Sequence, residues 1–77
     1  MSLEGQQRDP LSLVATLTAT ERQILSALVQ GRSIKSIATM VSLPLHTAES
    51  ARGALLERLS ARTVADAVRI GLLARIR

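Results

Sequence analysis

His46 is the only imidazole in the chain, and the chain contains no Cys. An imidazole acts as a general acid or base only with a partner side chain and a pocket, and no Ser or Asp forms a recognisable motif around His46. A metal site built from Cys and His is excluded by the same counts. The sequence also lacks a phosphate-binding loop, a carboxylate pair and a nucleophile constellation. We therefore expect no enzyme activity, no cofactor, no bound metal and no small-molecule ligand.

Basic side chains are the other chemistry that the chain offers. Ten Lys and Arg residues against six Asp and Glu residues give a formal net charge of +4, and all but one of the ten are Arg. This balance favours a polyanionic partner. Two interpretations remain open. One is a solvated rim in which Arg52 and Arg58 pair with Glu49 and Glu57 along a helix. The other is a phosphate-binding surface around the third helix expected below, made of Arg32, Lys35, Arg52, Arg58 and Arg62.

The composition indicates the elements that must position these side chains. Hydrophobic residues make up 47% of the 77 residues, yet Phe, Trp and Tyr are absent. A core of Leu, Ile, Val and Ala suits small packed helices better than a β-sandwich. We expect one all-α domain with a marginal core, because a chain of this length buries only about 60–65% of its unfolded surface.

Capping and breaking residues delimit four expected helices, at about 19–30, 34–41, 45–59 and 63–75. Thr18 and Glu21 form a Thr-x-x-Glu capping box, and Gly31 is free to take the left-handed conformation that ends a helix. Ser33 caps the second helix, and Pro44 prevents it from continuing into the third. Two short helices joined by a tight break, the second one longer, form a helix-turn-helix outline.

The N-terminal residues are expected to lie outside this domain, as a flexible tail over residues 1–15 ahead of a domain at 16–77. The opening MSLEGQQRDP is polar, and no basic segment leads into an apolar one, so we expect no targeting signal. No apolar run approaches the roughly 18 residues that span a bilayer. We expect a cytoplasmic protein that does not bind membranes.

The fourth helix carries apolar residues on more than one face. Five residues are expected to point inward: Val64, Ala67, Val68, Gly71 and Leu72. Leu73 points nearly opposite and Ile70 lies to the side, and two outward apolar side chains on a terminal helix indicate a contact surface. We expect a homodimer, or a heterodimer with a related protein, through an interface that contains Arg69, Ile70, Leu73 and Arg77.

Several segments in register resemble one family of DNA-binding domains. They are Leu17-Thr18-x-x-Glu21, Ile24-Leu25, Leu28-Val29-x-Gly31-x-Ser33-x-Lys35-x-Ile37-Ala38, Val41-x-Leu43, Thr47-Ala48 and Leu55-x-x-x-Leu59. Together they resemble the LuxR-type helix-turn-helix domain over roughly residues 16–74. The segment from Leu59 to Ile70 is similar to the output domains of FixJ-like response regulators, and Glu49 and Arg52 also fit that branch.

The resemblance implies a four-helix LuxR/FixJ-type fold with the third helix in the major groove of double-stranded DNA and the fourth helix packed against its copy. Lys35 and Thr47 match phosphate-contacting positions, to which the charge pattern adds Arg32, Arg52 and Arg58. The positions facing base edges are Glu49, Ser50 and Gly53, with His46 beside them. Thr47 has a second interpretation, as a replacement cap for the third helix.

The chain departs from the LuxR pattern around the third helix. The family's Val, Lys, His and Asn are replaced by Ala48, Glu49, Ala51 and Ala54, the capping Ser by Pro44, and the Gly after the helix by Ser60. The base-facing surface thereby becomes small and partly acidic. Glu49 can accept a hydrogen bond from a cytosine amino group, but it also repels phosphate.

Three functions are compatible with these observations. We favour a DNA-binding transcription regulator, free-standing or part of a larger protein, that binds a two-fold-related site as a dimer. The alternative is an interaction protein that keeps the fold and the fourth-helix interface but has lost DNA binding, and that antagonises a full-length regulator by pairing with it. A promoter-binding domain of a sigma factor is less favoured, because a capped helix follows Leu59.

Overall fold

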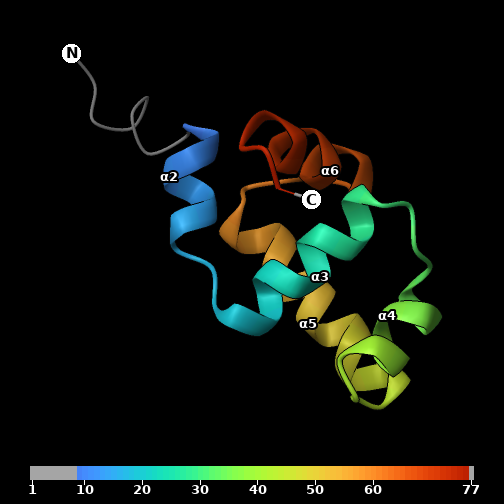
Figure 1. The fold of residues 1–77 in the computed structure, drawn as a ribbon. Coiled ribbons are helices and arrows are strands. Elements are labelled where there is room, and N and C mark those ends of the chain that lie inside the picture. Colours follow the sequence, from blue (N-terminus) through green and yellow to red (C-terminus); the bar gives the residue numbers. More distant parts are fainter. Residues whose placement is uncertain (1–8, 77) are drawn as a thin grey trace.

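Side-chain hydroxyls fix where three of the helices begin. The structure, a computed structural model, describes residues 9–76 (Figure 1). Helix α3 (Ala19–Val29) begins with a capping box, in which the Glu21 N–H donates to Thr18 Oγ1 at 3.1 Å and the Thr18 N–H donates to Glu21 Oε1 at 2.9 Å. Ser33 caps α4 (Ile34–Met40) and Thr63 caps α6 (Val64–Leu73) with a single bond each, in which the hydroxyl oxygen accepts from the backbone N–H three residues further on. The predicted caps at Thr18, Glu21 and Ser33 are therefore confirmed.

Helix α5 (Leu45–Arg58) begins without such a cap. Pro44 occupies the N-cap position and no side chain accepts a hydrogen bond from the first turn. The interpretation of Thr47 as a replacement cap is therefore wrong. The extended backbone of Pro44 ends the preceding turn, and its carbonyl oxygen accepts the first helical hydrogen bond, from the Ala48 N–H at 2.9 Å. Helices α3 to α6 begin and end within two residues of the ranges expected from the sequence.

A further helix, α2 (Pro10–Ala15), lies where the sequence predicted a tail. The expectation of a flexible segment over 1–15 is wrong for residues 10–15, while residues 1–8 lie outside the described residues. Pro10 stands in the first turn, where its missing N–H costs nothing. Val14 and Leu17 are buried in the core, and this burial holds the short helix against the rest of the domain. The described residues thus form five helices, and the domain includes α2.

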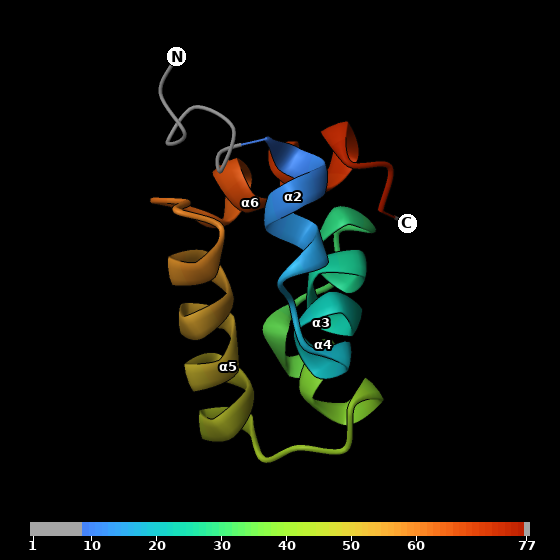
Figure 2. The ribbon, with the colours of Figure 1, turned by 90° about the vertical axis from the view of Figure 1, so that its left-hand side faces the viewer.

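The core lies between α3 and the helices that surround it. Its largest fully buried side chains are Ile24, Leu25, Ile37, Leu55 and Leu59. Helix α6 packs across α3 on one side, and α4 and α5 pack on another (Figure 1). As Figure 2 shows, α2 and α6 lie at one end of the molecule and the turn between α4 and α5 lies at the other. The helix-turn-helix is confirmed as α4, its turn and α5.

The buried face of α6 differs from the expected one. Ala67, Ile70 and Gly71 are buried, whereas Leu72 is 59% exposed. The expectations of an outward Ile70 and an inward Leu72 are therefore wrong. The physical reason is α2, which packs on α6 and covers the side of the helix that carries Ile70. The helical wheel of α6 alone contained no information about this contact.

The turn after α5 holds a residue in an unfavourable conformation. Ser60 has φ +54°, in the left-handed region that favours glycine. Its N–H donates to the carbonyl oxygen of Glu57 at 3.0 Å, and the Ala61 N–H donates to that of Leu56 at 2.8 Å. These bonds satisfy the last carbonyl groups of the helix in a Schellman arrangement. Ser60 therefore adopts the left-handed backbone conformation that glycine would adopt in this turn.

Replacing Ser60 by Gly should stabilise the domain. Removing the Cβ relieves a left-handed cost of about 1–2 kcal/mol, and the added freedom of the unfolded chain offsets about half of this. We expect the free energy of unfolding to rise by about 0.5–1 kcal/mol in urea unfolding followed by circular dichroism. Ser50→Gly, inside α5, is the matched control and should lower it by a similar amount. An equal loss at both positions would contradict the argument.

Candidate nucleic-acid interface

Helix α5 presents one face to the core and the opposite face to solvent. Ala48, Leu55 and Leu59 are buried, which fixes the rotation of the helix about its axis. The predicted base-facing residues are all exposed and follow the spacing of one helical face: His46, Glu49, Ser50 and Gly53. The structure therefore brings this predicted set together on an open surface.

The outer face of α5 is shallow. A Cβ built on Gly53 would meet no atom within 4 Å, so no internal packing requires glycine at this position. Ser50 and Ala54, also exposed, add only small side chains beside it. A helix with such a face brings its backbone close to whatever it contacts. The acidic group on this surface is Glu49, and Glu57 lies about two turns further along the helix.

The predicted phosphate-contacting residues come from two helices and the loop between α3 and α4. Lys35 is exposed on α4, and Thr47 and Arg52 are half-buried on α5, which packs against α4. Arg32 is exposed in the loop, where its Nε donates to Gln30 Oε1 at 3.2 Å. Within residues 9–76, neither Lys35 nor Arg52 forms an ion pair, so the expected pairing of Arg52 with Glu49 is not observed.

Arg58 has a structural partner that the sequence did not indicate. Its Nε donates to Glu21 Oε2 at 2.8 Å, joining the end of α5 to the start of α3. The arginine side chain is 51% exposed and the glutamate side chain only 9%. The expected pairing of Arg58 with Glu57 along α5 does not form, because the guanidinium is held by Glu21. Arg58 thus differs from Lys35 and Arg52 in having a carboxylate partner among the described residues.

The environment of Glu21 shifts its pKa. Burial raises the pKa of this carboxyl, but the N–H of Thr18 and the guanidinium of Arg58 outweigh burial and hold the pKa below its ordinary value. The ionised carboxylate therefore serves twice, as half of the capping box of α3 and as the anchor for Arg58. The sequence indicated the first role only.

Acid should remove this contribution to stability. Because the folded pKa of Glu21 is lowered, its stabilisation is present above the unfolded value of about 4.3 and is lost as the pH falls through the folded value. We expect the free energy of unfolding to fall below about pH 4. Glu21→Gln should lose about 2 kcal/mol at pH 7 and show a flatter pH dependence. Glu57→Gln, on the exposed face of α5, should keep the wild-type pH dependence, and a flattened profile in that variant would contradict the assignment.

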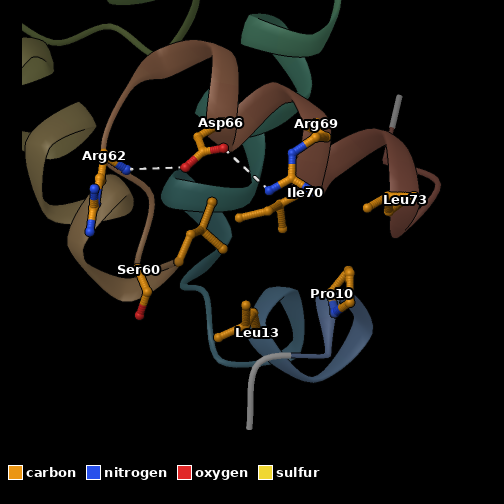
Figure 3. Close-up of a pocket in the computed structure, with 9 residues that line it drawn as sticks. Pro10, Leu13, Ser60, Arg62, Asp66, Arg69, Ile70 and Leu73 are labelled. Carbon is orange, nitrogen blue, oxygen red and sulfur yellow. Dashed lines mark hydrogen bonds and ion pairs between the residues drawn. The ribbon is translucent and has the colours of Figure 1, made fainter. Parts of the chain in front are cut away.

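Only some of the predicted dimer residues lie on a common exposed surface. Leu73 is 59% exposed, and Arg69 is exposed with its NH2 group donating to Asp66 Oδ1 at 3.2 Å (Figure 3). Ile70 is only 8% exposed, so it does not project outward as the sequence predicted. Arg77 lies outside the described residues. Leu72, which the sequence placed inward, joins Leu73 on the exposed part of α6.

Residues 9–76 hold neither a metal-binding cluster nor a helix able to cross a membrane. No group of three or more His, Cys, Asp or Glu side chains lies close enough together to hold a metal ion. None of the helices there has the length and apolar character needed to cross a membrane.

The chain is similar to known regulatory proteins over most of its length. The family model described as bacterial regulatory proteins, luxR family, matches residues 15–70. The transcriptional regulatory protein TdiR of Thauera aromatica is 32% identical over 63 residues, which cover 82% of this chain and 28% of the relative. The chain thus spans about 28% of the length of the relative that it matches. No solved structure matches it. Helices α3, α4 and α5 lie within the family match, whereas nearly all of α2 precedes it.

Proposed function

The chain belongs to the luxR family of bacterial regulatory proteins, which regulate transcription by binding DNA, and we propose that it does so with α5 in the major groove of double-stranded DNA. The observation that supports this proposal best is the open face of α5. His46, Glu49, Ser50 and Gly53 point away from the core, and no other part of the described chain covers them. A face of this width fits the major groove, which admits one α-helix.

The phosphate contacts proposed here come from Arg32, Lys35, Thr47 and Arg52. Thr47 and Arg52 are half-buried on α5 itself, Lys35 is exposed on α4, which packs against α5, and the cations of Lys35 and Arg52 form no ion pair within residues 9–76. Phosphate contacts position a protein on the duplex without specifying sequence. Base discrimination would then fall to the exposed face, with Glu49 accepting a hydrogen bond from a cytosine amino group. Arg58 has its main role in the ion pair with Glu21.

A dimer through α6 completes the proposal. Helix α6 lies at the end of the molecule opposite to the α4–α5 turn (Figure 2). Leu72 and Leu73 are exposed on α6, so a partner bound to them leaves the exposed face of α5 free. Two copies related by a two-fold axis would present two α5 helices to half-sites about one helical turn apart.

An antagonist without DNA binding is the second candidate. The acidic Glu49 on the exposed face of α5 favours it, because a carboxylate beside phosphates is repelled. Such a protein would use α6 to pair with a related regulator. The two candidates differ in whether this chain binds DNA by itself.

Titration of a fluorescent mixed-sequence duplex at about 50 and about 200 mM salt separates them. Each cation that neutralises a phosphate adds about 0.9 to the salt slope, so Arg32, Lys35 and Arg52 predict a loss of about 40-fold in affinity per bound protomer over this range. Lys35→Gln should reduce the slope by about 0.9 per protomer. Arg75→Gln, at the α6 end of the molecule, is the matched control and should leave the slope unchanged. A folded protein that does not bind at low salt would support the antagonist.

A further inference from the structure

The first residue of α5 is a leucine that the core does not bury. Leu45 is 42% exposed, whereas Leu55 on the same helix is fully buried and Leu56 packs against the core. A single exposed leucine is ordinary on a protein surface. The position of Leu45 distinguishes it, because the other exposed residues of α5 are all small or polar.

Leu45 stands in one row with two residues that the proposed function uses. Residues three and four apart lie on the same side of a helix, so Leu45, Glu49 and Arg52 follow one another along α5. Glu49 is exposed and Arg52 is half-buried. Leu45 also directly precedes His46. The exposed leucine is therefore continuous with the proposed base-facing surface.

The start of the helix fixes the backbone of Leu45. Pro44, at the N-cap, has a φ of −58° that its ring restrains, and its carbonyl oxygen accepts from the Ala48 N–H at 2.9 Å. Because Cα–Cβ bonds tilt toward the N-terminus of a helix, the side chain of Leu45 leans toward the α4–α5 turn, at one end of the molecule (Figure 2). Leu45 is thus presented by a rigid element, as discrimination between bases requires.

We propose that Leu45 contacts the methyl group of a thymine in the major groove, beside the base that Glu49 contacts. This inference rests on the proposed function and adds one residue and one base to it. The C5-methyl of thymine is the apolar group among the base edges of the major groove, where the other groups donate or accept hydrogen bonds. An exposed leucine on a helix in that groove therefore has one kind of apolar partner.

The spacing along α5 limits where this thymine lies. Leu45 and Glu49 are four residues apart, which corresponds to about 6 Å along the helix axis. Successive base pairs are about 3.4 Å apart along the duplex. We therefore expect the thymine within about two base pairs of the cytosine that Glu49 would contact. The two side chains together predict a site that combines a cytosine amino group with a thymine methyl group.

Replacement of thymine by deoxyuridine tests this contact, because the two differ only in the C5-methyl group. Duplexes that the full wild-type chain selects from a random pool are resynthesised with one thymine at a time replaced, and their affinities are measured by anisotropy. We expect one replacement to weaken binding about fourfold, the effect of withdrawing one methyl group from an apolar contact. The ratio should be the same at about 50 and about 200 mM salt, because this contact neutralises no phosphate.

Variants at position 45 assign the effect to the leucine. Leu45→Ala shortens the side chain and should bind the thymine and deoxyuridine duplexes equally. Leu45→Met keeps a long apolar side chain and should keep the fourfold ratio. Leu11→Ala, at a leucine of α2 that is 64% exposed, is the matched control and should keep the ratio as well. Circular dichroism checks that each variant is folded.

The outcomes separate this inference from the proposed function. A wild-type protein that binds DNA but is insensitive to deoxyuridine at every thymine would overturn the inference and leave the proposed function standing. The same holds if Leu45→Ala keeps the full ratio, because the effect then comes from another residue or from the duplex itself. A folded wild-type protein that binds no duplex at low salt would overturn both.

Discussion

Gly71→Val should strongly lower the free energy of unfolding of this domain. A Cβ built on Gly71 would lie 2.8 Å from Val29 Cγ2 and 3.2 Å from Leu25 Cδ1. Real Cβ atoms essentially never approach other atoms as closely as 2.8 Å, so α6 and α3 would have to separate. Val29 cannot move away easily, because a β-branched side chain has few allowed rotamers. Leu25 is fully buried and has no space to move into.

The expected magnitude follows from the cost of overpacking. We expect the free energy of unfolding to fall by about 2 kcal/mol and the melting temperature to fall by about 8–16 °C, measured by circular dichroism. Gly53→Val is the matched control, because a Cβ there meets nothing within 4 Å and Val is a slightly better helix former than Gly. The control should be neutral or slightly stabilising. Equal destabilisation in both variants would show that the contact between α3 and α6 is not the cause.

The sequence predicted the features that depend on neighbouring residues. The capping box of Thr18 and Glu21 and the cap at Ser33 are formed by groups three residues apart. Gly31, expected to take the left-handed conformation, has φ +83°. The buried stripe of α5 follows from helical periodicity because Ala48 and Leu55 have no competing apolar residues on the opposite face.

What the sequence did not predict depends on residues far apart in the chain. The partner of Arg58 is Glu21, 37 residues away, whereas the sequence alone suggested only a carboxylate of the same helix, Glu57. Helix α2 has six residues, too few to be stable alone, and it forms because it covers α6. The same contact buries Ile70. An available signal was the apolar spacing of Leu13, Val14 and Leu17, which is consistent with a helix that enters the core.

Glu49→Lys should have the largest effect on DNA binding of any single substitution on α5. The side chain is exposed at the centre of the proposed base-facing surface. Replacing a carboxylate by an ammonium changes the local charge by two units and should raise affinity for any duplex at low salt. It should also remove the hydrogen bond that we propose the carboxylate accepts from a cytosine amino group, a contact worth about 1–3 kcal/mol of base discrimination. The variant should therefore bind more tightly and less selectively.

Glu57→Lys separates these two effects. It makes the same change of charge on the same helix, about two turns from Glu49 and also exposed. The affinity for DNA fragments that the wild-type protein selects is measured by anisotropy. The affinity for copies of these fragments, in which one cytosine at a time is replaced, is then compared with it. Both variants should gain affinity for unselected DNA, but only Glu49→Lys should lose about 10-fold or more of the preference at one cytosine. If Glu57→Lys loses the same preference, the carboxylate of Glu49 does not contact a base.

The same substitution decides between the two proposed functions. If the wild-type protein is a regulator that binds DNA, Glu49→Lys weakens its preference for one cytosine while it raises the affinity for any duplex. If it is an antagonist, the wild-type protein does not bind at low salt and Glu49→Lys restores binding, because repulsion between the carboxylate and phosphate is removed while Lys35 and Arg52 remain in place. The exposed face of α5 is then intact in shape and altered only in charge. The carboxylate of Glu49 would therefore account by itself for the difference between a domain that binds DNA and a protein that only pairs with such a domain.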